Sequence, residues 1–150
     1  SNPLGMALAT ETRPFCVWHG MALRLESGVS EEDVVASGVV GEDEFILDCL
    51  ARYENRLVWQ GGRAVAAFVL QSDFYAATTK SETPVVTAIV VAPAFRRRGL
   101  ASAILRAIAT EAKGMVGLNS PWGWEEGVHG VRGMTVGDDG FVYLRFGDAA

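Results

Sequence analysis

The chain has 150 residues, a mass of 16.1 kDa and a formal net charge of −5. This length predicts one domain over residues 1–150, in which the opening SNPLGM (1–6) is interpreted as a tag remnant or a disordered start. The acidic balance argues against nucleic-acid binding, which needs a basic face, and no apolar run approaches the roughly 20 residues that cross a bilayer. Two isolated cysteines, Cys16 and Cys49, are expected to be buried thiols, so we predict no metal and a cytoplasmic location.

The first half of the chain predicts a strand, two helices and a hairpin. Residues 15–26 are apolar and loosely alternating, which indicates one strand. A helix is expected to begin after Ser30 as its N-cap, and a second helix is expected over 44–53. The pair Gly61-Gly62 between two β-rich runs indicates a tight hairpin.

The second half predicts a buried strand, a long helix and three further strands. The run VVTAIVV (85–91) is apolar on both faces, as expected at the centre of a covered sheet. Residues 100–114 have the apolar spacing of a helix. The remaining elements are a strand (115–119), a glycine-broken irregular stretch (120–133) and a hairpin (134–146) that turns at 138–140. This order is typical of an α+β fold with a mixed sheet.

The stretch VVAPAFRRRGLASAIL (90–105) joins the buried strand to the long helix and carries three consecutive arginines. The first N–H groups of a helix lack carbonyl partners and carry partial positive charge, so they attract anions. Gly99 allows a sharp bend, and the arginines add donors for phosphate oxygens. A solvated loop would explain the arginines alone, but the flanking strand and helix favour a pyrophosphate site. The chain has no GK[ST] or G-x-G-x-x-G motif that would offer another one.

This stretch resembles the acetyl-CoA-binding motif of the GNAT superfamily of N-acetyltransferases, V-x-P-x-[YF]-R-x-x-G-[LIV]-[GA]. Arg96, Gly99 and Ala101 match its fixed positions, and Phe95 matches its aromatic. The resemblance implies a GNAT-like α+β fold: a mixed, mostly antiparallel central β-sheet of about 6–7 strands, flanked by helices. It also implies an acetyl-CoA-dependent N-acetyltransferase, monomeric or homodimeric. An unidentified primary amine of a small molecule, peptide or protein would attack the acetyl group directly.

The resemblance also implies which residues bind the cofactor. In the family, main-chain N–H groups of the turn and helix start hold the pyrophosphate, which implies this role for residues 97–102. The strand before the turn pairs with the pantetheine arm, and an N–H near Val91 would polarise the thioester carbonyl. Asn119 takes the place of a motif asparagine. The implied cofactor-binding residues are Ile89, Val90, Val91, Arg96, Arg97, Arg98, Gly99, Leu100, Ala101, Ser102 and Asn119.

Two residues are candidates for proton transfer. Glu82 precedes the central strand and is either a general base or a solvated loop charge; a water relay or a neutral amine would serve without any side-chain base. His129 takes the place of a tyrosine acid found in many family members, and the alternative is a surface histidine in a loop. Family members often have a glutamate on or near the central strand, and residues 85–91 include no carboxylate. Because this carboxylate and the tyrosine are missing, the alternative function is a non-catalytic, regulatory acyl-CoA-binding module.

Overall fold

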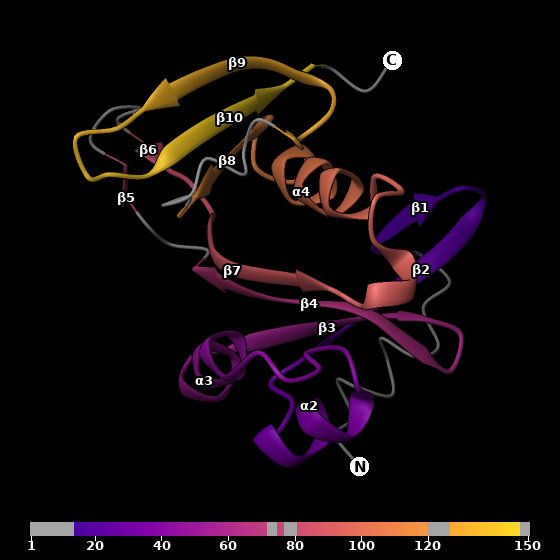
Figure 1. Cartoon of the computed structure of the whole chain (residues 1–150). Coiled ribbons are helices and arrows are strands. Elements are labelled where there is room, and N and C mark those ends of the chain that lie inside the picture. The colour runs from indigo at the N-terminus through magenta and orange to yellow at the C-terminus, as the bar shows by residue number, and fades with distance from the viewer. Residues whose placement is uncertain (1–13, 72–74, 77–80, 120–126, 148–150) are drawn as a thin grey trace, which may run out of the picture.

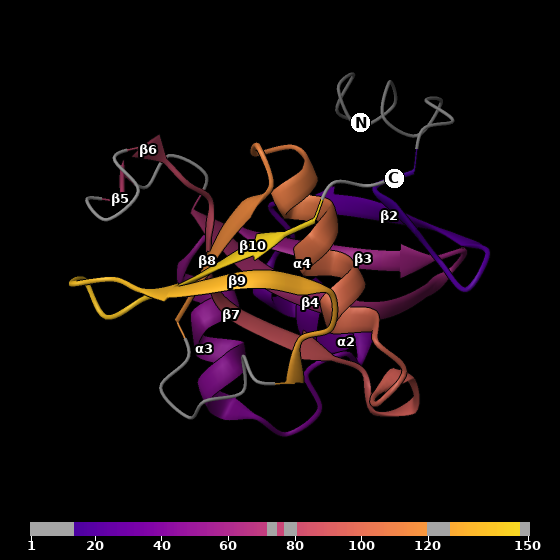
Figure 2. The ribbon, with the colours of Figure 1, turned by 90° about the horizontal axis from the view of Figure 1, so that it is seen from above.

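The computed structural model describes residues 14–71, 75–76, 81–119 and 127–147. An eight-stranded sheet has the order β1-β2-β3-β4-β7-β8-β10-β9, and β5 and β6 form a separate pair. Helices α2 and α3 lie on one face of the sheet and α4 lies on the other (Figures 1 and 2). The predicted start, 1–6, and residues 120–126, which are half of the predicted irregular stretch, lie outside the described residues.

The elements have the following bounds. The strands are β1 Cys16–Trp18, β2 Met21–Ser27, β3 Asn55–Gln60, β4 Arg63–Gln71, β5 Tyr75–Ala76, β6 Ser81–Glu82, β7 Val85–Val91, β8 Met115–Leu118, β9 Val131–Val136 and β10 Val142–Phe146. The helices are α2 Glu31–Ser37, α3 Glu44–Arg52 and α4 Leu100–Thr110, and a 3-10 turn, η1, spans Pro93–Phe95.

The structure confirms an α+β fold with a mixed, mostly antiparallel sheet, in which β7 and β8 are the parallel pair. The sheet has eight strands rather than the expected 6–7. The prediction of one strand over 15–26 is wrong, because the chain reverses at His19 and Gly20 and forms the hairpin β1–β2. Both turn residues have positive φ, 50° and 75°, as a tight two-residue hairpin turn requires.

The helices follow their capping residues. Ser30 caps α2, as predicted, and its Oγ accepts a hydrogen bond from the N–H three residues later at 3.2 Å. Helix α4 ends at Thr110, short of the predicted 114. Lys113 and Gly114 instead have φ values of 60° and 90°, and the Gly114 N–H donates to the Ala109 carbonyl at 2.7 Å. This left-handed exit turns the chain into β8.

Two hairpins are present where the glycines indicate them. β3 and β4 reverse at Gly61, whose φ is 58°, and β9 and β10 reverse over 138–140, as predicted. The second hairpin begins at Val131 rather than at residue 134. Because β9 is an edge strand whose side chains are mostly exposed, little apolar alternation marks where it starts.

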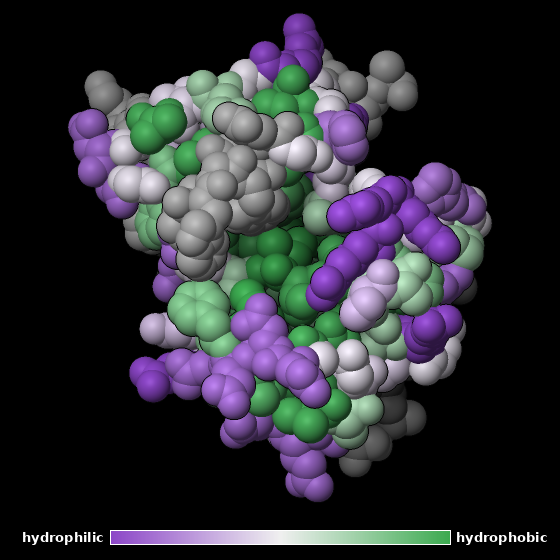
Figure 3. Space-filling model, viewed as in Figure 1, coloured by the Kyte–Doolittle hydropathy of each residue, from purple (hydrophilic) through white to green (hydrophobic). Residues whose placement is uncertain are grey.

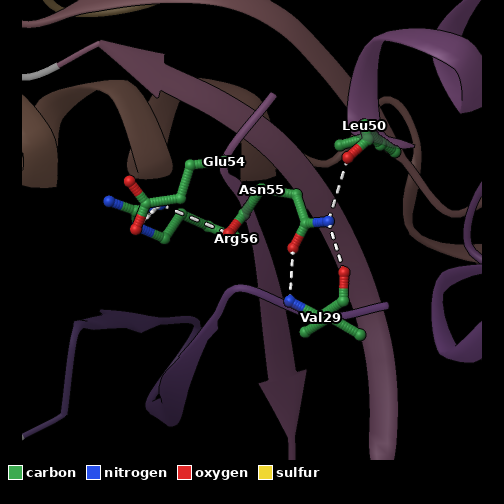
Figure 4. A network of polar contacts seen from close by, with 5 residues as sticks. All are labelled: Val29, Leu50, Glu54, Asn55 and Arg56. Atoms are coloured by element: carbon green, nitrogen blue, oxygen red, sulfur yellow. Dashed lines mark hydrogen bonds and ion pairs between the residues drawn. The ribbon is translucent and has the colours of Figure 1, made fainter. Parts of the chain in front are cut away.

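A buried asparagine ties the helices to the sheet (Figure 4). Asn55, at the start of β3, is 4% exposed. Its Oδ1 accepts from the Val29 N–H at 2.8 Å, and its Nδ2 donates to the carbonyls of Val29 and Leu50 at 2.7 and 3.0 Å. One side chain thereby joins the loop before α2 to the last turn of α3. Both of its polar atoms are bonded, as burial requires.

Candidate functional site

The neighbouring strands β7 and β8 pair only at the start of β7. Their register joins Val85 to Gly117 and Val86 to Leu118, and the Asn119 N–H then donates to the Val86 carbonyl at 3.1 Å. Past this point β7 has no strand partner on that edge among the described residues. A hollow with an apolar floor lies between the parts of the molecule that hold β8 and β7 (Figure 3).

A bulge in β7 sets which backbone groups face this hollow. In the pairing with β4, Val69 is opposite Ala88 and Leu70 is opposite Val86, so Thr87 is an extra residue. Backbone groups alternate in direction along a regular strand, and an extra residue shifts that alternation by one. After the bulge, the residues whose N–H and C=O groups point toward β4 are therefore those that would point away from it in a regular strand.

The end of β7 has two backbone positions that face away from β4. The Ala92 N–H donates to the Val65 carbonyl at 2.9 Å, and by alternation Val90 also faces β4. Ile89 and Val91 therefore direct their N–H and C=O groups toward the hollow. Of the three strand residues that the resemblance implies, these two have backbone groups available for an extended ligand.

The turn after β7 carries a series of backbone donors that bond to none of the described residues. Arg97 has a φ of 63°, and Gly99, with a φ of 79°, is the N-cap of α4. The first helical hydrogen bond is the one from Ala103 N–H to the Gly99 carbonyl at 3.0 Å. The backbone N–H groups of residues 97–102 have no hydrogen-bond partner in the described part of the chain. We call residues 97–102 the anion-binding turn, because six free donors at a helix start attract anions.

The predicted arginines make different contacts. Arg96 donates from Nε to the Val91 carbonyl at 2.8 Å, which fixes the start of the turn against the end of β7. Arg98 lies over the Phe95 ring at 6.0 Å from its centroid. Arg63, at the start of β4, lies over the same ring at 4.8 Å. Arg63 is thus a further cation beside the predicted site, and its sequence position gave no indication of this contact.

Two pockets adjoin the anion-binding turn. The first, of about 470 Å³, is lined by Val91, the turn, the first residues of α4 and His129. The second, of about 540 Å³, is lined by the β1–β2 hairpin, residues 97–99 and His129. Arg97, Gly99 and His129 line both. Among the described residues, no carboxylate lines either pocket, so their charged lining is cationic.

His129 lies beside the start of α4, although it is far from it in sequence. Its backbone N–H donates to Ser102 Oγ at 2.9 Å, and Ser102 is only 9% exposed. The His129 residue itself is exposed and lines both pockets. The structure therefore brings the predicted proton donor to the predicted cofactor-binding turn.

Two predicted residues lie elsewhere. Glu82 is exposed in β6, at the end of β7 opposite the anion-binding turn (Figure 1). β7 has seven residues, which span about 20 Å. Asn119 is exposed at the end of β8, where β7 and β8 separate. Neither residue lines either of the two pockets.

Two residues beside the site were not predicted from sequence. Trp18 Nε1 donates to the Arg98 carbonyl at 3.1 Å, and His19 Nε2 lies 3.2 Å from the same oxygen. The Trp18-His19-Gly20 sequence contains a turn signal, but no local pattern indicates a partner 80 residues away. The β1–β2 hairpin thus contacts the anion-binding turn directly.

Two other findings concern the composition-based predictions. In the part of the chain that the structure describes, no group of three or more His, Cys, Asp or Glu side chains could hold a metal ion. The described helices include none with the length and apolarity to span a membrane. Cys16 and Cys49 are unpaired and half-buried, and burial raises the pKa of the Cys16 thiol to about 11.

Comparison with known proteins identifies a family. The model of the acetyltransferase (GNAT) family matches residues 29–128 of the 150, which include β7, the anion-binding turn and α4. No curated protein matches the chain.

Several solved structures share the fold. A GNAT family acetyltransferase from Listeria monocytogenes 4b F2365 is 10% identical with a TM-score of 0.55, and the match covers 85% of this chain and 96% of that one. A protein from Pyrococcus horikoshii OT3 is 14% identical with a TM-score of 0.51, covering 85% and 99%. A Bacillus subtilis acetyltransferase in complex with CoA is 15% identical with a TM-score of 0.50, covering 83% and 97%. The family model and the shared fold together show that this chain belongs to the GNAT acetyltransferase family.

Proposed function

We propose that this protein is an acetyl-CoA-dependent N-acetyltransferase that acetylates a primary amine. The observation that carries the proposal is the anion-binding turn, whose six N–H groups have no partner among the described residues. A pyrophosphate offers several anionic oxygens to such donors. The Bacillus subtilis acetyltransferase of similar fold was solved with CoA, which supports CoA as the ligand here.

The strand edge of β7 fits the rest of the cosubstrate. Pantetheine carries amide groups that can pair with the Ile89 and Val91 backbone as an added strand would. The Val91 carbonyl already accepts a hydrogen bond from Arg96 Nε. We therefore assign the Val91 N–H and the N–H and C=O of Ile89 to the ligand. One of these N–H groups would donate to the thioester oxygen and stabilise the negative charge that develops there.

The proposed reaction is a direct transfer. The neutral amine nitrogen attacks the acetyl carbonyl carbon, the C–S bond breaks, and the nitrogen gives its extra proton to water. The departing thiolate takes a proton from the imidazolium of His129, which lines both pockets and is then reprotonated by water. Products are an N-acetylated amine and CoA. Glu82 remains a prediction as the base, but a water relay needs no carboxylate in the pockets.

The second candidate function is a non-catalytic acyl-CoA-binding module. It is favoured by the absence of a carboxylate from the two pockets, as far as the described residues go. Both functions use the same anion-binding turn, so they differ in turnover and not in cosubstrate affinity. We propose the cytoplasm as the location under either function.

The test is acetyl-CoA consumption in the presence of a panel of small amines and amine-bearing peptides, followed by mass spectrometry of the acceptors. The transferase predicts an acetylated acceptor with wild-type protein and a loss of roughly a hundredfold in rate with His129→Ala, at unchanged CoA affinity. Glu82→Gln is expected to leave the rate unchanged if water accepts the proton. CoA binding without turnover of any amine would favour the module instead.

A further inference from the structure

We infer that Trp18 and His19 are positioning residues that hold the anion-binding turn in its ligand-binding conformation. This inference rests on the proposed function, because it concerns how CoA phosphates are bound. The inference gives a role to the β1–β2 hairpin, which lines one of the two pockets beside the turn.

The contact consists of two donors on one carbonyl. Trp18 Nε1 donates to the Arg98 oxygen at 3.1 Å, and His19, with its Nε2 protonated, donates to the same oxygen from 3.2 Å. Trp18 is 5% exposed, and its ring lies 4.7 Å from the His19 ring and 6.1 Å from the Phe95 ring. The indole is therefore fixed between the hairpin and the start of the turn.

Burial alone does not explain this arrangement. A buried indole N–H needs some acceptor, so the Trp18 bond by itself is expected. His19 is exposed and has water available, yet its ring nitrogen lies at the same carbonyl. The hairpin turn places both residues there, since His19 and Gly20 have the positive φ values of a tight two-residue turn.

Holding this oxygen orients a donor of the anion-binding turn. In a trans peptide the C=O and the following N–H point in opposite directions, and the structure has no cis peptide among the described residues. With the Arg98 carbonyl directed at the hairpin, the Gly99 N–H points away from it. The Gly99 N–H is one of the six free donors.

The turn needs stabilising contacts from outside because one of its residues has a strained backbone conformation. Arg97 has a β-carbon and a φ of 63°, a left-handed conformation that non-glycine residues avoid. Such a conformation persists only where the surrounding structure fixes it. The two bonds to the neighbouring Arg98 carbonyl supply this constraint from an element distant in sequence.

The first test is calorimetric titration of CoA into Trp18→Phe and His19→Ala. Trp18→Phe keeps an aromatic ring and removes the N–H, and His19→Ala changes an exposed side chain, so the second variant alters no buried packing. Each is expected to weaken CoA binding about fivefold, the loss of one hydrogen bond. The matched control is Trp59→Phe, which removes the bond from Trp59 Nε1 to Glu26 Oε1 (3.0 Å) on the exposed surface and should bind CoA as the wild type does.

The second test separates positioning from a general loss of stability. Arg97→Gly removes the left-handed penalty and the charge, whereas Arg97→Ala removes only the charge. Trp18→Phe should weaken CoA binding about fivefold in the Arg97→Ala background and less than twofold in the Arg97→Gly background. A general loss of stability would act equally in both.

The outcomes are distinguishable. If the wild type does not bind CoA, the proposed function is overturned and this inference with it. If the wild type binds CoA but Trp18→Phe and His19→Ala bind equally well, the inference is overturned while the proposed function stands. Equal effects of Trp18→Phe in the two Arg97 backgrounds also overturn it.

Discussion

Two regions of this molecule use their backbone polar groups in opposite ways. Around Asn55, a buried side chain bonds one N–H and two carbonyls that would otherwise lack partners. In the anion-binding turn, six consecutive N–H groups have no partner among the described residues. The first arrangement stabilises the fold, since buried polar groups must be paired. The second leaves donors that a ligand could use, and this is why we propose the turn as the binding site.

Removing the Asn55 side chain should have the largest effect on the stability of the fold. Asn55→Leu should lower the free energy of unfolding by about 3 kcal/mol, because Val29 and Leu50 lose buried hydrogen-bond partners. Urea denaturation measures this change, and CoA affinity per folded molecule should not alter. The control is Glu54→Gln, which breaks the neighbouring 3.4 Å ion pair with Arg56 and should cost less than about 1 kcal/mol. Equal effects would contradict the role given to Asn55.

A smaller effect is expected at Ser102. It belongs to the anion-binding turn, and its buried side chain accepts a hydrogen bond from a backbone N–H, as the Asn55 side chain does. Ser102→Ala removes the acceptor of the His129 N–H and should lower the free energy of unfolding by about 1 kcal/mol. Hydrogen exchange at the His129 amide should become faster. Thr110→Ala in the same helix removes an exposed bond to the Arg106 carbonyl and should leave that exchange unchanged. An unaltered His129 amide in Ser102→Ala would show that the bond does not hold this loop.

The last effect appears only at alkaline pH and concerns Cys16, whose thiol belongs to neither the Asn55 network nor the anion-binding turn. Burial raises its pKa to about 11 from 9.0, so the folded state holds the thiol proton more tightly than the unfolded state does. This contribution to stability is fully present below pH 9 and is lost as pH rises toward 11. Alkylation measured at Cys16 in the native protein should accelerate through pH 10 without a plateau, and Cys16→Ala should remove this pH dependence of stability. A plateau near pH 9 would show an ordinary thiol.

The local structure around the candidate site could be predicted from the sequence. The buried strand, the arginines, Gly99 and the apolar helix are contiguous, so the turn could be predicted from one stretch. Gly61 likewise marked its own hairpin. These features depend on residues near one another in the chain, whose conformational preferences act directly.

The remaining parts depend on contacts between distant residues. Nothing near Trp18 indicates Arg98 as a partner, and nothing near Arg63 indicates Phe95. The extra residue at Thr87 depends on the register with β4, which an unbroken apolar run leaves unspecified. His-Gly at 19–20 is a weaker turn signal than Gly-Gly, and so one strand was predicted where the structure has two.

The central claim is that the backbone of the anion-binding turn binds the phosphates of CoA, and one measurement tests it most directly. CoA is titrated calorimetrically into wild type, Gly99→Ala and Gly61→Ala. Both glycines have positive φ, 79° and 58°, and an added Cβ meets no atom within 4 Å at either, so each variant should lose roughly 1–2 kcal/mol of stability. We predict that Gly99→Ala alone weakens CoA binding by at least about tenfold, equivalent to about 1.4 kcal/mol. Wild-type affinity in Gly99→Ala would contradict the claim.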